Sequence, residues 1–139
     1  MSIGGHTGWV RDLTIEDRWL FSCGCNHLLQ WDLAWPVPKQ VGDIELFTGD
    51  IQTILTIPGR VFAACANGSL HSWTLAKNGS MDHGNQLLNA HSERILALQH
   101  FEGILYTAGS DGAIKAWNAE TLELLNVRPP TSEVEVYNI

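Results

Sequence analysis

The chain has 139 residues, of which 45% are hydrophobic, and a formal net charge of −7. This length predicts one domain with a hydrophobic core of its own. The negative charge argues against nucleic-acid phosphates and anionic membranes as partners. No apolar run reaches the roughly 18–20 residues that a membrane-spanning helix needs. The chain has three cysteines and no secretory signal pattern at its first residues, so we expect a reducing compartment, the cytoplasm or the nucleus.

Short apolar runs separated by turn residues predict β-strands along the whole chain. None of these runs shows the sustained apolar stripe that marks a helix. The first unit predicts strands at 9–15, 19–24, 28–33 and 44–48. The second unit predicts strands at 51–57, 60–65, 70–75 and 86–90. The third unit predicts strands at 94–100, 104–109, 114–119 and 121–127. Three four-stranded antiparallel sheets in tandem are therefore expected.

The chain repeats itself, because three tryptophans recur at intervals of 42 and 44 residues. A fixed period of this size is typical of solenoids and propellers. Aligning the units on these tryptophans brings two further columns of residues into register. The three columns are Trp31, Trp73 and Trp117; His6, Phe47 and His91; and Val10, Ile51 and Ile95.

Three segments carry a family resemblance: Gly5-His6, Trp31-Asp32 and the stretch LYTAGSDGAIKAWN at 105–118. They resemble WD repeats, and the resemblance extends from residue 5 to about residue 127. It implies an all-β fold, a partial β-propeller of three four-stranded antiparallel blades. We expect the blades within residues 1–128, at about 8–48, 50–90 and 94–127, and a C-terminal tail at 129–139.

The resemblance also implies a buried chain of polar side chains inside each blade, because a buried imidazole and a buried indole N–H each need a partner. The third repeat has the complete set, whereas the second is expected to depend on apolar packing. The implied positions are His91, Thr107, Asp111 and Trp117 in the third repeat; His6, Ser22, Asn26 and Trp31 in the first; and Phe47, Ala63, Asn67 and Trp73 in the second.

His91 and Asp111, with a hydroxyl nearby, could also imitate the constellation of a hydrolase. We expect a structural role for both instead, because the repeat accounts for the same residues without any chemistry. The sequence has no nucleophile elbow, phosphate-binding glycine loop or zinc-protease signature. We therefore predict neither catalytic residues nor a cofactor.

Cys23, Cys25 and His27 alternate along an extended segment and could approach one soft metal ion from the same face. Their spacing differs from the usual pair of cysteines two to four residues apart, and no second pair follows. Cysteine also commonly fills small buried positions in strands. Ordinary packing is the prediction, with no metal bound.

WD-repeat propellers serve mainly as docking platforms, so the resemblance implies a protein or peptide partner. The expected site flanks the column Val10, Ile51 and Ile95, near the central channel. Trp and Arg are common at interface hot spots, which favours Trp9 and Arg94. A second candidate surface is the apolar loop around Trp35. The predicted partner-binding residues are Trp9, Arg11, Asp50, Gln52, Arg94, Leu96 and Ser110.

Three blades do not close a ring, since closed propellers have roughly 4–8 blades. Either the chain is part of a larger propeller, or copies associate to complete one. The function we expect is that of a non-enzymatic scaffold or adaptor within a larger intracellular complex. The alternatives are a structural or truncated propeller fragment without binding activity, a propeller enzyme, or an RNA-binding subunit.

Overall fold

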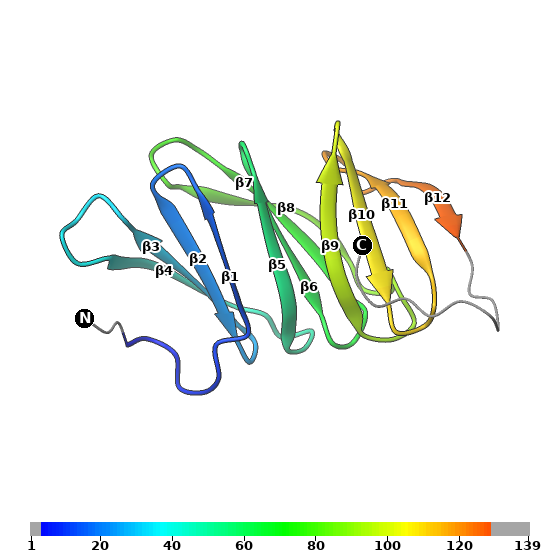
Figure 1. Ribbon diagram of the computed structural model, residues 1–139, viewed down its shortest axis with the longest axis horizontal. Coiled ribbons are helices and arrows are strands. Elements are labelled where there is room, and N and C mark those ends of the chain that lie inside the picture. The colour runs from blue at the N-terminus through cyan, green and yellow to red at the C-terminus, as the bar shows by residue number, and fades with distance from the viewer. Residues whose placement is uncertain (1–3, 129–139) are drawn as a thin grey trace.

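The computed structural model describes residues 4–128 and shows twelve strands in three separate sheets (Figure 1). Blade one consists of β1 (Asp12–Glu16), β2 (Trp19–Gly24), β3 (His27–Asp32) and β4 (Lys39–Glu45). Blade two consists of β5 (Ile51–Ile57), β6 (Arg60–Cys65), β7 (Leu70–Leu75) and β8 (Met81–Leu87). Blade three consists of β9 (Ile95–Phe101), β10 (Ile104–Gly109), β11 (Ile114–Asn118) and β12 (Leu124–Arg128). The expected fold, a partial β-propeller of three four-stranded antiparallel blades, is confirmed.

The strands of each blade pair antiparallel in chain order, so that every connection inside a blade is a hairpin. The register places each repeat tryptophan opposite an aliphatic residue of the preceding strand: Trp31 opposite Leu20, Trp73 opposite Val61 and Trp117 opposite Leu105. No helix occurs within residues 4–128, and so none there is long and apolar enough to cross a membrane.

The fourth strand of the first two blades differs from the prediction. The predicted ranges 44–48 and 86–90 begin too late and overlap only the last two residues of β4 (Lys39–Glu45) and of β8 (Met81–Leu87). Both strands are polar and largely exposed, so no apolar alternation marks them. Backbone pairing with the third strand of the blade determines where they lie. The first strand, predicted at 9–15, is also shifted and begins at Asp12.

The core lies between the blades, because the innermost strands β1, β5 and β9 run side by side (Figure 1). One buried cluster joins blades one and two and includes Phe21, Ile54 and Trp73. A second cluster joins blades two and three and includes Phe62 and Trp117. Each sheet therefore buries its apolar side chains against its neighbour, as stacked β-sheets do.

Polar contacts fix how β1 sits against β5. The Asp12 carboxylate accepts hydrogen bonds from the Thr53 hydroxyl and the Ile54 amide, both at 3.0 Å. The hydroxyls of Thr14 and Thr56 are 2.7 Å apart. These contacts occur at half-buried positions, where satisfied hydrogen bonds add specificity to apolar packing.

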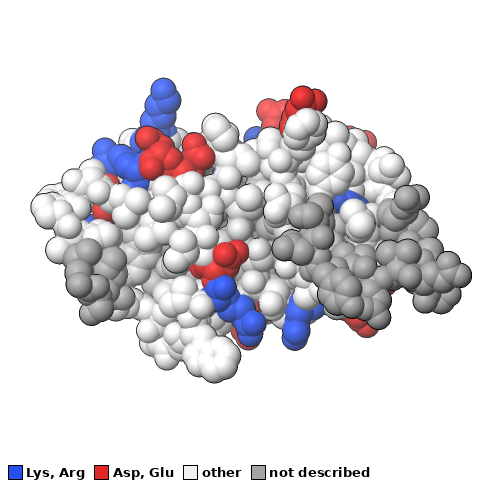
Figure 2. Space-filling view, viewed as in Figure 1, with Lys and Arg blue, Asp and Glu red and all other residues white. Residues whose placement is uncertain are grey.

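The loops divide between two edges of the molecule. The segment before β1, the β4–β5 and β8–β9 loops and the hairpin turns β2–β3, β6–β7 and β10–β11 share one edge, the lower one in Figure 1. We call this edge the loop edge. On the face drawn in Figure 2, basic and acidic side chains form small separate groups on a largely uncharged surface. An extended basic patch, the feature that nucleic-acid backbones need, is not visible on that face.

Candidate functional site

The polar chain expected in blade three is present. His91 Nε2 is 2.7 Å from the Thr107 hydroxyl, and the Trp117 indole N–H donates to the same hydroxyl at 2.9 Å. On its other side, His91 Nδ1 is 3.1 Å from both carboxylate oxygens of Asp111. All four side chains thus have partners, and His91 and Thr107 are buried. This arrangement holds the β8–β9 loop against β10 and β11.

Burial and hydrogen bonding shift the pKa values of the acid–base pair. Burial lowers the pKa of His91, although the hydrogen bond to Asp111 acts in the opposite direction. For Asp111, burial raises the pKa, but hydrogen bonds from the Ala113 amide and from His91 outweigh it, so that the pKa is lowered overall. The pair is therefore arranged for stability, with an ionised carboxylate beside a neutral imidazole at neutral pH.

Blade one has a shorter version of the same chain. His6 Nε2 is 2.7 Å from the Ser22 hydroxyl, which accepts a hydrogen bond from the Trp31 indole at 3.0 Å. The expectation that Asn26 replaces the turn aspartate is wrong. Asn26 instead donates to the Leu46 carbonyl at 3.1 Å, because the β2–β3 turn is one residue shorter and directs this side chain toward the β4–β5 loop.

Blade two departs from the prediction. Phe47, aligned with the two histidines, is 88% exposed and takes no part in the core. The next residue, Thr48, occupies the place instead, and its hydroxyl is 2.9 Å from Nε2 of the buried His71. The side chain of Asn67 donates to the Thr48 carbonyl and accepts from the Ser69 hydroxyl at 2.7 Å. Apolar packing alone does not hold this blade, because a polar network of its own joins the β4–β5 loop to β7.

His71 is unusual among the histidines. Burial, together with the nearby charge of His83, lowers its pKa to about 4. Within residues 4–128 its Nδ1 atom is buried without a hydrogen-bond partner. His71 is therefore a neutral core residue at physiological pH.

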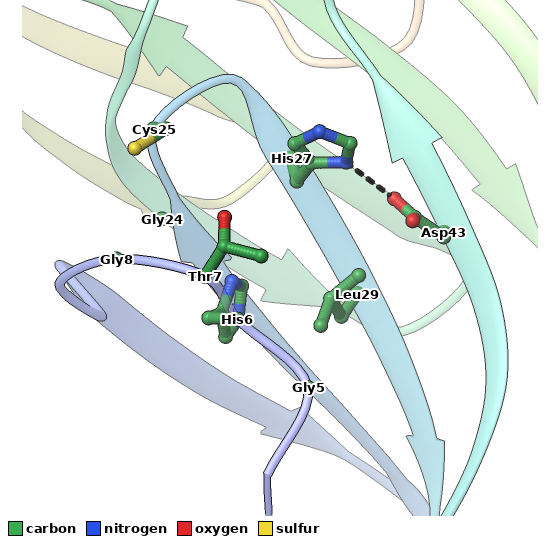
Figure 3. Close-up of a pocket in the computed structure, with 9 residues that line it drawn as sticks. All are labelled: Gly5, His6, Thr7, Gly8, Gly24, Cys25, His27, Leu29 and Asp43. Atoms are coloured by element: carbon green, nitrogen blue, oxygen red, sulfur yellow. Dashed lines mark hydrogen bonds and ion pairs between the residues drawn. The ribbon is translucent and has the colours of Figure 1, made fainter.

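The structure separates the three residues considered for a metal site, two of which, Cys25 and His27, are drawn in Figure 3. Cys23 is buried in the core between blades one and two, and burial raises the pKa of its thiol to about 12. Cys25 is exposed at the hairpin turn and its thiol points away from His27. His27 Nδ1 is paired with Asp43 Oδ1 at 2.8 Å, a contact that raises the pKa of the histidine. Within residues 4–128 no three His, Cys, Asp or Glu side chains cluster to hold a metal ion.

The pocket drawn in Figure 3 lies beside these residues and is small. It has a volume of about 100 Å³, whereas small-molecule sites typically measure about 300–1,000 Å³. Its polar lining includes His6, whose pKa burial lowers, with a further contribution from His27. The pocket is too small for a typical organic substrate. Its lining residues are Gly5, His6, Thr7, Gly8, Gly24, Cys25, His27, Leu29 and Asp43.

The predicted partner-binding residues come together at the loop edge. Asp50 and Arg94 directly precede β5 and β9. The carbonyl oxygen of Asp50 accepts a backbone hydrogen bond of 2.8 Å from the β6–β7 turn, and that of Arg94 accepts one of 2.8 Å from the β10–β11 turn. Trp9 is 86% exposed, and its carbonyl oxygen lies against Gly24 at the matching turn of blade one. Trp9, Arg11, Asp50, Arg94 and Ser110 are exposed, whereas Gln52 and Leu96 are half-buried.

Phe47 is an addition that sequence reasoning missed at this edge. With 88% of its surface exposed in the β4–β5 loop, it is a second accessible aromatic residue beside Trp9. Its spacing from Trp73 placed it in the histidine column, which suggested a buried position. The loop has five residues between β4 and β5, against seven between β8 and β9, and Thr48 rather than Phe47 contacts the blade.

Comparisons with known proteins agree with this architecture. Residues 1–32 match the family model described as "WD domain, G-beta repeat". Over 130 residues the chain is 30% identical to cilia- and flagella-associated protein 44 of Mus musculus. The match covers 87% of this chain and 7% of the mouse protein. The chain thus spans a small part of the length of this relative.

Two solved structures share the fold. They are the computationally designed proteins Ika8, with a TM-score of 0.80, and Ika4, with a TM-score of 0.81, each 19% identical in sequence. In both comparisons 99% of this chain is covered, together with 41% of the Ika8 chain and 82% of the Ika4 chain.

Proposed function

Because the chain carries WD repeats folded as the blades of a partial propeller, we propose that it is a non-enzymatic scaffold or adaptor. It binds a protein or peptide partner at the loop edge and serves within a larger intracellular complex. The observation that carries this proposal is the exposure of Trp9, Phe47 and Arg94 on loops tied to rigid blades. Exposed aromatic and arginine side chains on a fixed framework are typical of interface hot spots.

The polar chains inside the blades support the scaffold over an enzyme. His91 hydrogen-bonds Asp111 on one side and the Thr107 hydroxyl on the other, and Trp117 donates to the same hydroxyl. A catalytic base needs access to a substrate proton, whereas His91 is 1% exposed. These residues therefore stabilise the blade.

The mouse relative suggests which complex the chain serves. Its name associates that protein with cilia and flagella. We propose that this chain belongs to a ciliary or flagellar assembly and reaches it from the cytoplasm. The nucleus is the other location that we expect from the sequence. Imaging a tagged chain in ciliated cells tests this, since diffuse or nuclear signal alone would contradict a ciliary assembly.

A pull-down with four variants tests the binding edge. Trp9→Ala and Arg94→Ala remove two exposed side chains of the loop edge, and we expect recovery of the partner to fall at least tenfold. Trp35→Ala and Lys77→Ala are matched controls, because both residues are exposed and lie in the loops of the opposite edge. Recovery that falls only with Trp35→Ala would move the site to that edge.

We also propose that two copies of the chain associate. This interaction uses the outer faces of the two end blades and leaves the loop edge free. Leu13 and Phe101 are 59% and 63% exposed on these faces, and exposed apolar sheet surfaces favour association.

A further inference from the structure

The interface between neighbouring blades occurs twice within the chain, and each end blade offers one half of it. Blade two presents Val61 and Trp73 to blade one, and blade three presents Leu105 and Trp117 to blade two; all four are buried. Strand register places Leu20 and Trp31 at the same positions of blade one. We call the face of a blade that is turned toward the preceding blade its near face, and the opposite one its far face. The near face of blade one, which is turned away from blade two, therefore has the same construction as two faces that are already covered.

The innermost strand shows that this near face is incompletely covered. In β5, Ile54 is 5% exposed because it packs into the core with blade one. The position in β1 that matches Ile54 is Leu13, since Leu13 pairs with Ser22 just as Ile54 pairs with Ala63. Leu13 is 59% exposed, and Ile15, two residues later, is 55% exposed.

The far face of blade three, which is turned away from blade two, offers the other half of the interface between neighbouring blades. In blade two, the far face contributes Phe62 and Ile57 to the cluster shared with blade three. The matching residues of blade three are Tyr106 and Phe101, because Phe101 pairs with Ile104 just as Ile57 pairs with Arg60. Phe101 is 63% exposed, whereas Phe62 is fully buried.

We propose that the far face of blade three docks on the near face of blade one of a second copy. The proposal rests on the self-association proposed above and specifies its faces and their order. Inside the chain, a four-stranded blade covers each matching face of blades two and three. A blade of a second copy therefore fits the exposed end faces, because it presents the same kinds of residues at the same positions. Along the facing strands the outward residues of β1 are Leu13 and Ile15, and those of β9 include Gln99 and Phe101. None of these is charged, so docking buries no unpaired charge along these strands.

The number of copies follows from closure. A head-to-tail contact makes a ring when its rotation closes and an open filament when it does not. Two copies of three blades give six blades, within the roughly 4–8 blades of closed propellers, whereas three copies would give nine. A two-copy ring therefore contains two identical contacts between blade three and blade one.

Light scattering coupled to size exclusion tests the arrangement through the mass of the 139-residue chain. The wild-type chain should elute at twice its monomer mass of 15.4 kDa. Leu13→Asp and Phe101→Asp should each elute as monomers, because each places a carboxylate in both contacts of the ring. Leu88→Asp is the control that should leave the dimer intact, since Leu88 is 54% exposed in the β8–β9 loop and lies on neither end face.

Mixing the two variants tests the order of the faces. A ring of one Leu13→Asp chain and one Phe101→Asp chain retains one contact free of substitutions, so the mixture should recover a dimer that neither variant forms alone. Circular dichroism of each variant checks that the blades are folded. A monomeric wild type would overturn self-association altogether. A dimer that is lost with Phe101→Asp but kept with Leu13→Asp would overturn only the head-to-tail order, and neither result concerns partner binding at the loop edge.

Discussion

His71 of β7 stands directly opposite Ala63 of β6 and reaches Thr48 in the β4–β5 loop, with 2.9 Å between Nε2 and the hydroxyl. In blades one and three the arrangement is reversed: the loop supplies the histidine and the second strand supplies the hydroxyl, from Ser22 and Thr107. Blade two thus makes the same kind of loop-to-sheet hydrogen bond, but the loop supplies the hydroxyl and the third strand, not the second, supplies the imidazole.

Acid should destabilise the protein partly through His71. Its pKa is about 4 in the folded chain, against 6.5 for an ordinary histidine. Between these values the unfolded chain binds a proton that the folded chain does not, so stability falls as pH drops from 6.5 toward 4. A difference of 2.5 pKa units corresponds to about 3 kcal/mol.

Urea unfolding at pH 7, 5.5 and 4.5 measures this dependence, with His71→Leu for comparison. Leucine suits the site, because Leu29 occupies the matching position of blade one opposite Ser22. The variant should lose stability at pH 7 yet show a shallower decline toward acid, with His91 and His6 among the groups that contribute the remainder, since burial also lowers their pKa values. An unchanged slope would show that His71 does not titrate as described.

Removing the Thr107 hydroxyl should be costly. Thr107→Val keeps the shape of the side chain but leaves His91 Nε2 and the Trp117 indole without their shared partner. Each buried polar group left unsatisfied costs about 1–3 kcal/mol, so we expect a loss of about 2–5 kcal/mol. The free energy of unfolding from denaturant titration checks this value.

Ser22→Ala provides the comparison for that variant. It removes the equivalent hydroxyl of blade one, but there His6 is half-buried and regains water more readily. The expected loss is smaller, about 1–2 kcal/mol. A loss equal to or larger than that of Thr107→Val would contradict the greater role assigned to the complete set in blade three.

Two glycine substitutions separate backbone conformation from close packing. Gly59 and Gly68 both have positive φ, 82° and 89°, where a side chain is disfavoured. A Cβ at Gly59 meets nothing within 4 Å, whereas a Cβ at Gly68 would overlap the His91 carbonyl oxygen. Gly59→Ala should therefore cost only about 1–2 kcal/mol for the left-handed conformation. Gly68→Ala should cost clearly more, and similar melting temperatures for the two variants would contradict the tight contact between blades two and three.

The three thiols should react at very different rates. Cys25 is exposed, whereas Cys23 and Cys65 are buried, and burial raises the pKa of both. Because the thiolate is the reactive form, only Cys25 should be labelled rapidly by a maleimide in the native chain. Mass spectrometry should show one label per chain before unfolding and three afterwards. Rapid native labelling of Cys25→Ser would mean that one of the buried sites opens.

The sequence predicted the second and third strands of each blade closely, because these strands pack in the core and their apolar residues recur at the repeat period. It placed β4 and β8 wrongly because these outer strands are polar and depend on backbone pairing with β3 and β7. The column alignment found the half-buried His6 of blade one and the buried His91 of blade three. It assigned Phe47 to the histidine column of blade two, since counting residues from Trp73 does not reveal that the β4–β5 loop is shorter than the β8–β9 loop.

The candidate site followed the same division. The repeat alignment placed Ile51 and Ile95 at matching positions, and both begin the first strand of their blade at the loop edge; that a partner binds beside them stays a prediction. The exposure of Phe47 depends on the path of its loop, which no local pattern in the sequence marks. The exchange between Thr48 and His71 joins positions 23 residues apart, and only the folded blade brings them together.

The stacking of the blades has a consequence for how the chain opens. One core cluster joins blade one to blade two and the other joins blade two to blade three, so within one chain each end blade packs only against the middle blade. In such a nearest-neighbour array the local free energy of opening depends on how many neighbours an element has. In the monomeric Leu13→Asp or Phe101→Asp chain, where each end blade has one neighbour, amide protons of β6 should therefore exchange more slowly than those of β2 or β10.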